Sequence, residues 1–377
     1  MIDRTLRESI LSGLGNKKAI IIMGARQVGK STLLKQTLGD RNDILWLDGD
    51  EDDVRQLFLQ ANSTRLKAII GNKHMVVIDE AQRIPDIGLR MKLITDQMPD
   101  IQLVATGSSS FDLASKVNEP LTGRKREFRM YPLTFAEMVQ HTSLLDELRM
   151  IPHRLVYGYY PEVVSNPGDE KTILKELTDS YLYRDLLTFD RVAHSNKLAA
   201  LLKALAFQIG SQVSNRELGL LIGLDPKTID KYIDILEKSY IILRIGSFSR
   251  NLRNELKTTQ KIYFWDLGIR NAIIGNLAQV ENRSDVGELW ENYVIAERLK
   301  SNGYRNSFAN SWFWRTKQQQ EIDYLEEEDG QISAFEMKWN DKKANTKCPD
   351  SFTKAYPSAT FQVITPSNIE TILLAGK

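Results

Sequence analysis

Short apolar runs separated by longer segments of mixed character dominate the first part of the chain. Each run is about as long as one buried strand, and polar residues or glycine bound it. Because segments with helical periodicity lie between the runs, the pattern predicts an α/β fold, a parallel sheet with helices on both faces. The predicted strands span residues 19–23, 43–48, 74–78, 101–105 and 127–131.

A helical pattern replaces the apolar runs in the middle of the chain. Residues 171–189 place apolar side chains on one face and predict a small helical lid, within a connector over 141–195. Arg184 in this stretch would contact a phosphate from the lid, or it would form an ion pair on the helix surface.

The pattern between residues 196 and 275 predicts a winged helix-turn-helix. Ser214 and Glu217 form a capping-box pair, and Asp225-Pro226 supplies a cap and a first-turn proline for the last of the helices. The predicted helices are 196–210, 218–222 and the segment after residue 226, and the predicted strands are 240–243 and 261–265.

The last of these helices and the loop between the two strands carry cations suited to phosphate contacts. Helical spacing turns Lys227, Thr228, Lys231 and Tyr232 outward, so that residues near the helix start would meet base edges in the major groove. The alternative is a winged helix that only packs between subunits. The predicted DNA contacts are Lys227, Thr228, Lys231, Arg250 and Arg253.

An amphipathic helix followed by short strands closes the chain. The helix is predicted over 287–300, and the strands lie at 312–314, 320–325 and 332–338. Together with the preceding segments, this pattern gives four predicted domains. They are the α/β domain with the parallel sheet over 1–140, the connector over 141–195, the winged helix over 196–275 and a small α/β domain over 282–377.

Residues 24–31 read GARQVGKS, which fits the phosphate-binding pattern G-x-x-x-x-G-K-[ST]. An apolar strand precedes this phosphate loop and a helix follows it, which is the context that the pattern requires. Lys30 would reach the β- and γ-phosphates of ATP, and the Ser31 hydroxyl would help to hold Mg²⁺. The predicted nucleotide contacts are Gly24, Ala25, Arg26, Gln27, Val28, Gly29, Lys30, Ser31 and Thr32.

Acidic and hydroxyl side chains follow two other predicted strands. Asp79 ends the strand at 74–78 and would bind Mg²⁺, and Glu80 would polarise the attacking water, which favours a hydrolase over a kinase. Ser108, or else Thr106, follows the strand at 101–105 and would orient that water. Ordinary capping of the strand end is the alternative for the two hydroxyl groups.

The basic cluster Arg124-Lys125-Arg126 has two interpretations. It would be a solvated basic loop, which is the usual environment of such a run. Alternatively, Arg124 would reach the nucleotide of a neighbouring subunit as an arginine finger. The sequence does not separate the two.

Four charged residues of the C-terminal segment have the spacing of a nuclease-like metal site. Asp323 and Glu336 would share a divalent metal, Lys338 would orient water or stabilise developing charge, and Glu291 would complete the site. The alternative is a solvated strand whose fold persists without cleavage.

The composition argues against a membrane protein and against a fold held together by disulfides or zinc. Hydrophobic residues make up 42% of the chain, and no run approaches the length of a membrane helix. Cys348 is the single cysteine, which excludes internal disulfides and zinc clusters. We therefore expect a cytoplasmic protein. The net charge of +1 decides nothing about nucleic acid, because a basic face can exist within a neutral total.

Several of these segments together resemble one family. GARQVGKST, VVIDEAQR, VATGSSS and LTGR…YPLTFAE are similar to a bacterial and archaeal family of AAA-type ATPases whose C-terminal region is a domain of unknown function. The similarity extends through most of the chain, although Gly158-Tyr159-Tyr160-Pro161 departs from the family's Gly-Gly-aromatic-Pro. It implies a restriction-endonuclease-like C-terminal fold.

The sequence therefore predicts an ATPase that acts on nucleic acid, by translocation, remodelling or processing of duplex or branched DNA. The expected ligands are ATP and Mg²⁺, and the expected assembly is a homo-oligomeric ring such as a hexamer. Two alternatives stay open. One is a nucleotide-dependent switch that binds a protein partner, and the other is an ATP-dependent nuclease.

Overall fold

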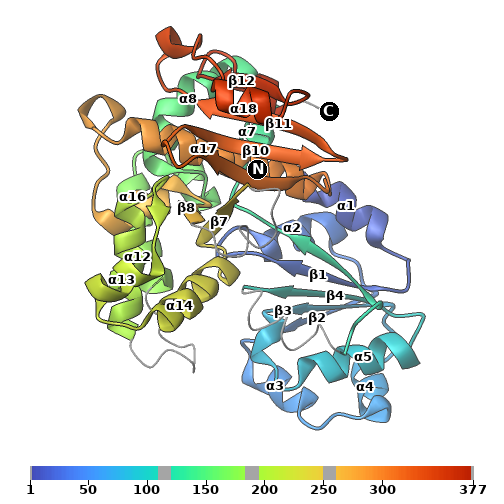
Figure 1. Ribbon diagram of the computed structural model, residues 1–377. Helices are drawn as coiled ribbons and strands as arrows, with labels where there is room; N and C mark the ends of the chain where they lie inside the picture. The colour runs from blue at the N-terminus through green and yellow to red at the C-terminus, as the bar shows by residue number, and fades with distance from the viewer. Residues whose placement is uncertain (1, 109–119, 183–194, 249–259, 375–377) are drawn as a thin grey trace. The chain divides into compact units, whose positions relative to one another are not determined.

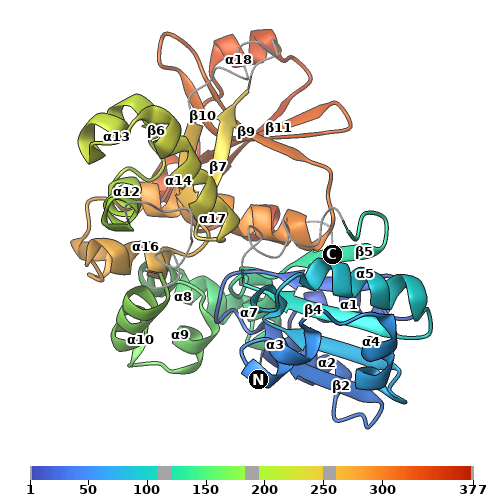
Figure 2. The ribbon, with the colours of Figure 1, turned by 90° about the horizontal axis from the view of Figure 1, so that it is seen from below.

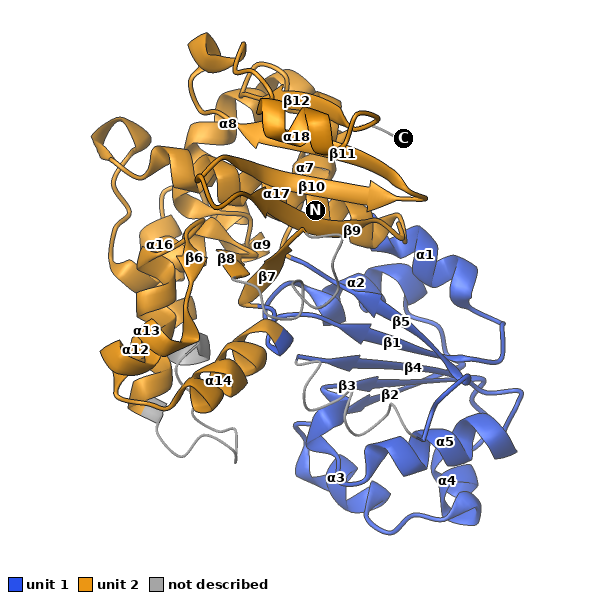
Figure 3. Ribbon diagram, in the orientation of Figure 1, with its two compact units in different colours: residues 1–131, 238–240 blue, residues 132–237, 241–377 orange. Residues whose placement is uncertain are grey.

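The computed structural model describes residues 2–108, 120–182, 195–248 and 260–374. The chain forms two compact units (Figure 3). The first comprises residues 1–131 with 238–240, and the second comprises 132–237 with 241–377. The second unit thus contains nearly all of the three segments predicted to follow the ATPase domain.

The first unit is built on a parallel sheet whose described strands lie in the order β2-β3-β4-β1-β5 (Figure 1). Strands β1 and β3 consist almost entirely of buried apolar residues, as expected for central strands that helices cover on both faces. The strands are β1 Ala19–Met23, β2 Ile44–Asp48, β3 Met75–Asp79, β4 Gln102–Gly107 and β5 Lys125–Arg129.

The helices of this unit cover both faces of its sheet. Helix α1 packs against α2, and α4 packs against α5. The connection from β1 to β2 crosses the sheet in one direction, and the connections from β2 to β3 and from β3 to β4 run in the other direction. Because crossovers between parallel strands are right-handed, the pair α1–α2 and the pair α4–α5 lie on opposite faces of the sheet. The helices are α1 Leu6–Gly13, α2 Lys30–Leu38, α3 Asp52–Phe58, α4 Ser63–Ile70, the 3₁₀ turn η1 Ala81–Arg83 and α5 Ile87–Gln97.

One mixed sheet runs through the second unit, with its described strands in the order β12-β11-β10-β9-β7-β8-β6. Neighbouring strands are antiparallel except for the parallel pairs β11–β12 and β7–β9. The predicted winged helix and the predicted C-terminal domain therefore share a sheet. The strands are β6 Gln212–Val213, β7 Ile242–Ser247, β8 Gln260–Phe264, β9 Asn310–Arg315, β10 Glu321–Glu328, β11 Gln331–Met337 and β12 Thr360–Ile364.

Helices cluster around this sheet (Figure 2). Helix α17 contacts both β8 and β11, and α16 packs against α8 and α12. The helices are α7 Phe135–His141, α8 Leu144–Tyr157, α9 Pro161–Ser165, α10 Glu170–Glu176, α12 Ser195–Phe207, α13 Asn215–Ile222, α14 Pro226–Lys238, α16 Leu267–Ile274, α17 Val286–Tyr304, α18 Asp350–Ala355 and α19 Glu370–Leu373. Short turns of other types are the π-helix η2 Leu177–Leu182 and the 3₁₀ turns η3 Val280–Asn282 and η4 Asp341–Lys343.

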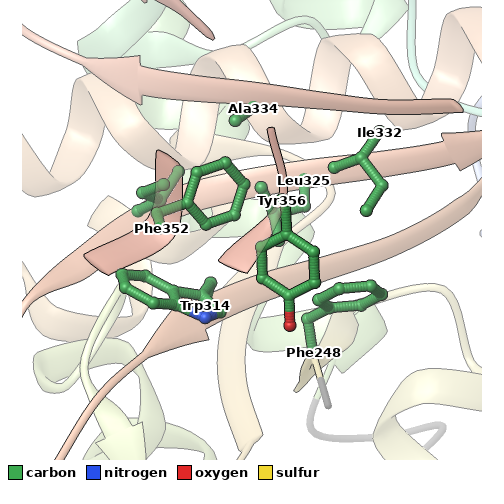
Figure 4. Close-up of a cluster of buried hydrophobic side chains, with 8 residues drawn as sticks. Phe248, Trp314, Leu325, Ile332, Ala334, Phe352 and Tyr356 are labelled. Carbon is green, nitrogen blue, oxygen red and sulfur yellow. The ribbon is translucent and has the colours of Figure 1, made fainter. Parts of the chain in front are cut away.

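A buried aromatic cluster joins segments that are far apart in the chain (Figure 4). Phe248 follows β7, and its ring lies 5.4 Å from that of Tyr356 at the end of α18. Trp314 of β9 lies edge-on to Phe352 of α18, with 5.2 Å between ring centroids. The residue directly after β7 is thus part of the core formed by the C-terminal strands.

The structure changes some predicted boundaries and one orientation. Strand β5 begins at Lys125 rather than at residue 127, and β7 covers residues 242–247 rather than 240–243. Tyr232 was expected to face outward but is only 2% exposed, because it packs into the buried side of α14. Arg184 lies outside the described residues. Within the described ranges, no helix is both long enough and apolar enough to span a lipid bilayer.

Candidate functional site

The phosphate loop connects β1 to α2 as predicted. Gln27 and Gly29 have φ values of 58° and 93°, and α2 begins at Lys30. Such a left-handed turn at a helix start directs successive backbone N–H groups toward one point, which forms an anion site. Gly24 is required at the other end of the loop, because an added Cβ would lie 2.1 Å from the carbonyl oxygen of Met130.

Lys30 is buried within this loop. Its Nζ donates to the carbonyl oxygens of Gly24 at 3.1 Å and Ala25 at 2.8 Å. Burial lowers the pKa of the Lys30 ammonium to about 8, although the nearby carboxylates of Glu80 and Asp79 act to raise it. The lysine is therefore held against its own loop, close to both predicted acids.

Asp79 and Thr106 meet at the carboxyl ends of β3 and β4. The Thr106 hydroxyl donates to Asp79 Oδ1 and accepts from the backbone N–H of Glu80 at 3.1 Å. The hydroxyl thus fixes the end of the strand that presents both acids. Asp79 and Ser31 supply the oxygen ligands that Mg²⁺ prefers, so the residues present fit this ion.

Glu80 and Ser108 are joined through a residue that the sequence did not single out. Gln82 Nε2 donates to Glu80 Oε2 at 2.5 Å and to Ser108 Oγ at 2.9 Å. Glu80 itself has a φ of 46°, a strained value for a residue that is not glycine. The structure therefore brings Glu80, Ser108 and Thr106 together at one end of the sheet.

Arg124 lies at the other end of the same sheet. Its carbonyl accepts from the N–H of Ala19, the first residue of β1, whereas the phosphate loop follows the last residue of β1. Its side chain forms an ion pair with Asp96 at the end of α5. Because a five-residue strand is roughly 16 Å long, Arg124 does not reach the phosphate loop of its own chain.

The predicted DNA-contacting residues have different surroundings. Lys227 and Lys231 are exposed on α14. Thr228 donates from its backbone N–H to the cap residue Asp225 at 3.0 Å, and its hydroxyl also bonds to Asp225. The predicted cap of this helix is thus present. Arg250 and Arg253 lie outside the described residues.

A second charged cluster gathers around Glu291 of α17. Glu291 Oε1 accepts from the Lys261 ammonium at 2.9 Å and from the Tyr263 hydroxyl at 2.6 Å. Lys261 also pairs with Glu321 at 2.5 Å, and its side chain is only 2% exposed. Lys261 and Tyr263 lie two residues apart on β8 and therefore share a face. Strand β8 thus supplies a buried cation that the sequence analysis missed.

The other predicted residues of this cluster come from β10, from β11 and from the position directly after β11. The pairing of β9 and β10 shifts register between Ile322 and Leu325, which places Asp323 on a bulge. Asp323 Oδ2 accepts from the Met337 N–H at 2.8 Å, and Lys338 Nζ lies 2.5 Å from Glu336 Oε1. The charges of Glu291, Asp323, Glu336 and Lys338 act on one another, so these four side chains lie close together.

The acids of this cluster are perturbed by burial and by one another. Burial, followed by the charge of Asp323, raises the pKa of both Glu291 and Glu336. Burial also acts to lower the pKa of Lys261, but the surrounding carboxylates outweigh it and raise that pKa. The cluster therefore stabilises Lys261 as a cation.

The fit of a divalent metal to this cluster is poor in the arrangement observed. Among the described residues, no group of three or more His, Cys, Asp and Glu side chains is arranged to hold a metal ion. Lys261 lies between Glu291 and Glu321 and supplies the positive charge that the acids require. A metal would have to compete with this ammonium.

The sequence did not point to Lys261 and Tyr263, because both belong to a predicted apolar strand and their partner Glu291 is distant in the chain. It did not point to Gln82 either, because Ser108, one of its partners, is also distant in the chain. The alternation in KIYFW could have predicted the shared partner of Lys261 and Tyr263. A lysine and a tyrosine two residues apart in a strand lie on the same face of the sheet.

Three family models match consecutive parts of the chain. Residues 16–139 match an AAA domain. Residues 148–280 and 286–371 match two domains of unknown function, DUF8612 and DUF4143. The border between the second and third models falls just before α17.

Proteins from distant organisms are similar to the chain over most of its length. An uncharacterized protein of Mycobacterium tuberculosis is 25% identical over 328 residues, 85% of this chain and 70% of that protein. One from Haemophilus influenzae is 27% identical over 310 residues, 74% of each chain. The Walker-type ATPase PABY2304 of Pyrococcus abyssi matches with a TM-score of 0.51 and 16% identity, over 72% of this chain and 96% of that one, a likeness of fold alone. The chain thus carries an AAA-type ATPase domain, which supports ATP hydrolysis, and two regions that match domains of unknown function.

Proposed function

We propose that this chain hydrolyses ATP and couples hydrolysis to remodelling, translocation or processing of nucleic acid. The convergence of the phosphate loop with Asp79, Glu80 and the hydroxyls of Thr106 and Ser108 at one end of the sheet carries the ATPase part of this proposal. Each of these groups has a distinct task in phosphoryl transfer to water.

The residues of the site divide the work among them. The loop N–H groups and Lys30 would bind the phosphates, which requires Lys30 to leave the carbonyls of Gly24 and Ala25. Ser31 and Asp79 would hold Mg²⁺, which supplies positive charge against the phosphate oxygens. Glu80 would accept the proton of the attacking water, once its carboxylate is released from Gln82.

The nucleic-acid part of the proposal rests on the segment around α14. Helices α12, α13 and α14 are followed by the antiparallel pair β7–β8, with β6 added beside β8, which is compatible with a winged helix. Lys227 and Lys231 are exposed on α14 and would contact phosphates, which dominate nucleic-acid affinity.

Measuring ATP turnover without DNA and with single-stranded, duplex and four-way-junction DNA tests both parts. We expect turnover with Mg²⁺ and stimulation by at least one DNA form. Lys30→Ala should weaken ATP binding by roughly tenfold or more, since a charged hydrogen bond contributes ~1.5–3 kcal/mol. Glu80→Gln should bind ATP without turnover.

The outcomes separate the alternatives. Turnover by Glu80→Gln at the unmodified rate would show that Glu80 is not the base. Turnover that is indifferent to every DNA form would favour a nucleotide-dependent switch that binds a protein partner.

A second candidate function is an ATP-dependent nuclease that uses the acids around Glu291. Asp323, Glu336 and Lys338 are residue types used in metal-assisted hydrolysis, and a metal would have to displace the Lys261 ammonium from Glu291 and Glu321. If the cluster cleaves DNA, Mn²⁺ should support nicking that Asp323→Ala abolishes and that Glu327→Ala, on the same strand, leaves intact. ATP turnover should be unchanged in both variants. Absence of nicking of any DNA form with Mg²⁺ or Mn²⁺ would remove this candidate.

A further inference from the structure

We infer that Arg4 is a positioning residue for the phosphate loop and that it links the loop to the segment of residues 130–135, here called the exit segment. This inference rests on the proposed function, because it requires that the loop bind ATP. It assigns a role to a residue that no motif includes.

Arg4 contacts the outer side of the phosphate loop. It precedes α1 and is only 8% exposed. Its Nη1 donates to the carbonyl oxygen of Val28 at 2.7 Å, and its Nη2 donates to the carbonyl oxygen of Tyr131 at 2.7 Å. One planar guanidinium thus joins the middle of the loop to the chain that leaves β5.

The bond to Val28 bears on phosphate binding. Val28 lies between Gln27 and Gly29, the two loop residues with positive φ. In such a loop the N–H groups point toward the anion and carbonyl oxygens point away from it. A cation that binds a carbonyl on the outer side stabilises this orientation of the peptide groups. Arg4 therefore favours the loop conformation that receives a phosphate.

The exit segment also contacts the beginning of the loop. Met130 donates its N–H to Met23 at 2.7 Å. The Met130 carbonyl lies so close to Gly24 that no side chain fits there. A displacement of the loop at Gly24 or Val28 would therefore displace Met130 or Tyr131 as well.

Directly after Tyr131, backbone groups of the chain form hydrogen bonds to two buried charged side chains, Glu297 and Lys300. Leu133 donates its N–H to Tyr159 at 3.0 Å, and its carbonyl accepts from Lys300 at 3.3 Å. Phe135 donates its N–H to Glu297 at 2.7 Å, and Glu297 pairs with Lys300 at 2.6 Å.

Both of these charged residues belong to α17, the helix that carries Glu291. Phe135 is four positions after Tyr131, so the chain between them spans at most roughly 14 Å. A shift at Tyr131 would consequently reach the anchoring bonds on α17 through a short covalent path.

Amide hydrogen exchange with and without a non-hydrolysable ATP analogue tests this inference in the full-length protein. The amides of Leu133 and Phe135 report on the exit segment, and those of residues 24–31 report on the loop. We expect the analogue to slow exchange at both places in the unmodified protein. In Arg4→Met the response at Leu133 and Phe135 should be lost.

Kinetics on the same variants separates positioning from catalysis. Arg4→Met should raise the KM for ATP about tenfold and change kcat less, because the lost bonds orient the loop without touching the reacting atoms. Arg4→Lys keeps the charge and should recover part of the affinity. Arg7→Met removes an exposed arginine of the adjacent helix α1 and should change neither the KM for ATP nor kcat.

The outcomes are distinguishable. An unmodified protein that binds no ATP would overturn the proposed function together with this inference. A protein that binds ATP, whose Arg4→Met variant is folded by its unfolding midpoint and still shows the full response at Leu133 and Phe135, would overturn the inference alone.

Discussion

Burial of the Lys30 ammonium makes ATP affinity dependent on pH in a range where phosphates no longer titrate. Because the pKa of Lys30 is lowered to about 8, the ammonium is present at pH 7 and largely lost at pH 9. Above pH 8 the neutral amine must take up a proton before it can pair with phosphate. We therefore expect ATP binding to weaken as the pH rises from 7 to 9.

Calorimetric titration in buffers of different ionisation enthalpy provides the measurement. Binding should take up close to one proton per ATP at pH 9 and almost none at pH 7. Equal ATP affinity and equal proton uptake at pH 7 and pH 9 would show that Lys30 does not titrate in this range.

Residues in fixed motifs could be predicted from the sequence, and their partners could not. Lys30, Asp79 and Ser108 follow strands at spacings that the parallel sheet imposes, so their convergence follows from local pattern. Arg4 and Lys261 act on groups that are distant in the chain, and no local pattern encodes such contacts. Gln82 is close to Glu80 in sequence, but it also bonds to Ser108, which follows a different strand.

At the scale of single elements, β8 is tied to α17 and β10 by the buried Lys261. Removing one partner of a buried ion pair leaves an uncompensated charge and typically costs about 3–5 kcal/mol. We expect Lys261→Met to lower the free energy of unfolding by that amount, measured with urea. Lys317→Met, an exposed change beyond β9, should have almost no effect.

A double-mutant cycle distinguishes the ion pair from packing. Adding Glu291→Gln to Lys261→Met should recover part of the lost stability, because the second change removes a buried charge that has lost its partner. If the two losses are simply additive, the pair contributes nothing specific.

The exposed lysines of α14 test the proposed contact with nucleic acid. Replacing Lys227 and Lys231 with alanine should make the salt dependence of DNA affinity shallower by about two units of logarithmic slope, since each phosphate contact contributes about 0.9. Lys203→Ala on α12 serves as the control. An unchanged slope would leave α14 as a packing element.

Element boundaries were the least predictable feature. Polar side chains at the start of β5 and inside β7 hid the true extent of both strands. Arg244 lies within β7, where Asp234 at 3.1 Å and Glu237 compensate its charge. The parallel pairing of β7 with β9 could not be predicted, because no short-range pattern brings these two strands together.

At the scale of the whole molecule, the place of Arg124 bears on assembly. An arginine at the amino end of the sheet would assist hydrolysis only at a neighbouring copy's nucleotide, after release from Asp96. Mixing Arg124→Ala with Lys30→Ala protein should then restore part of the ATPase activity that each variant lacks alone. A protein that stays monomeric with ATP by light scattering, yet hydrolyses it normally, would refute this role.

The parallel contact of β7 with β9 also constrains how such proteins can diversify. Gly246 and Ser247 of β7 pair with Trp312 and Phe313 of β9, although a border between family models separates the two strands. A gene rearrangement at this border would leave β7 with a bare edge of unpaired N–H and C=O groups, and such edges promote aggregation. The C-terminal half should therefore be inherited and exchanged as one block, with substitutions on either side of the border compensating each other.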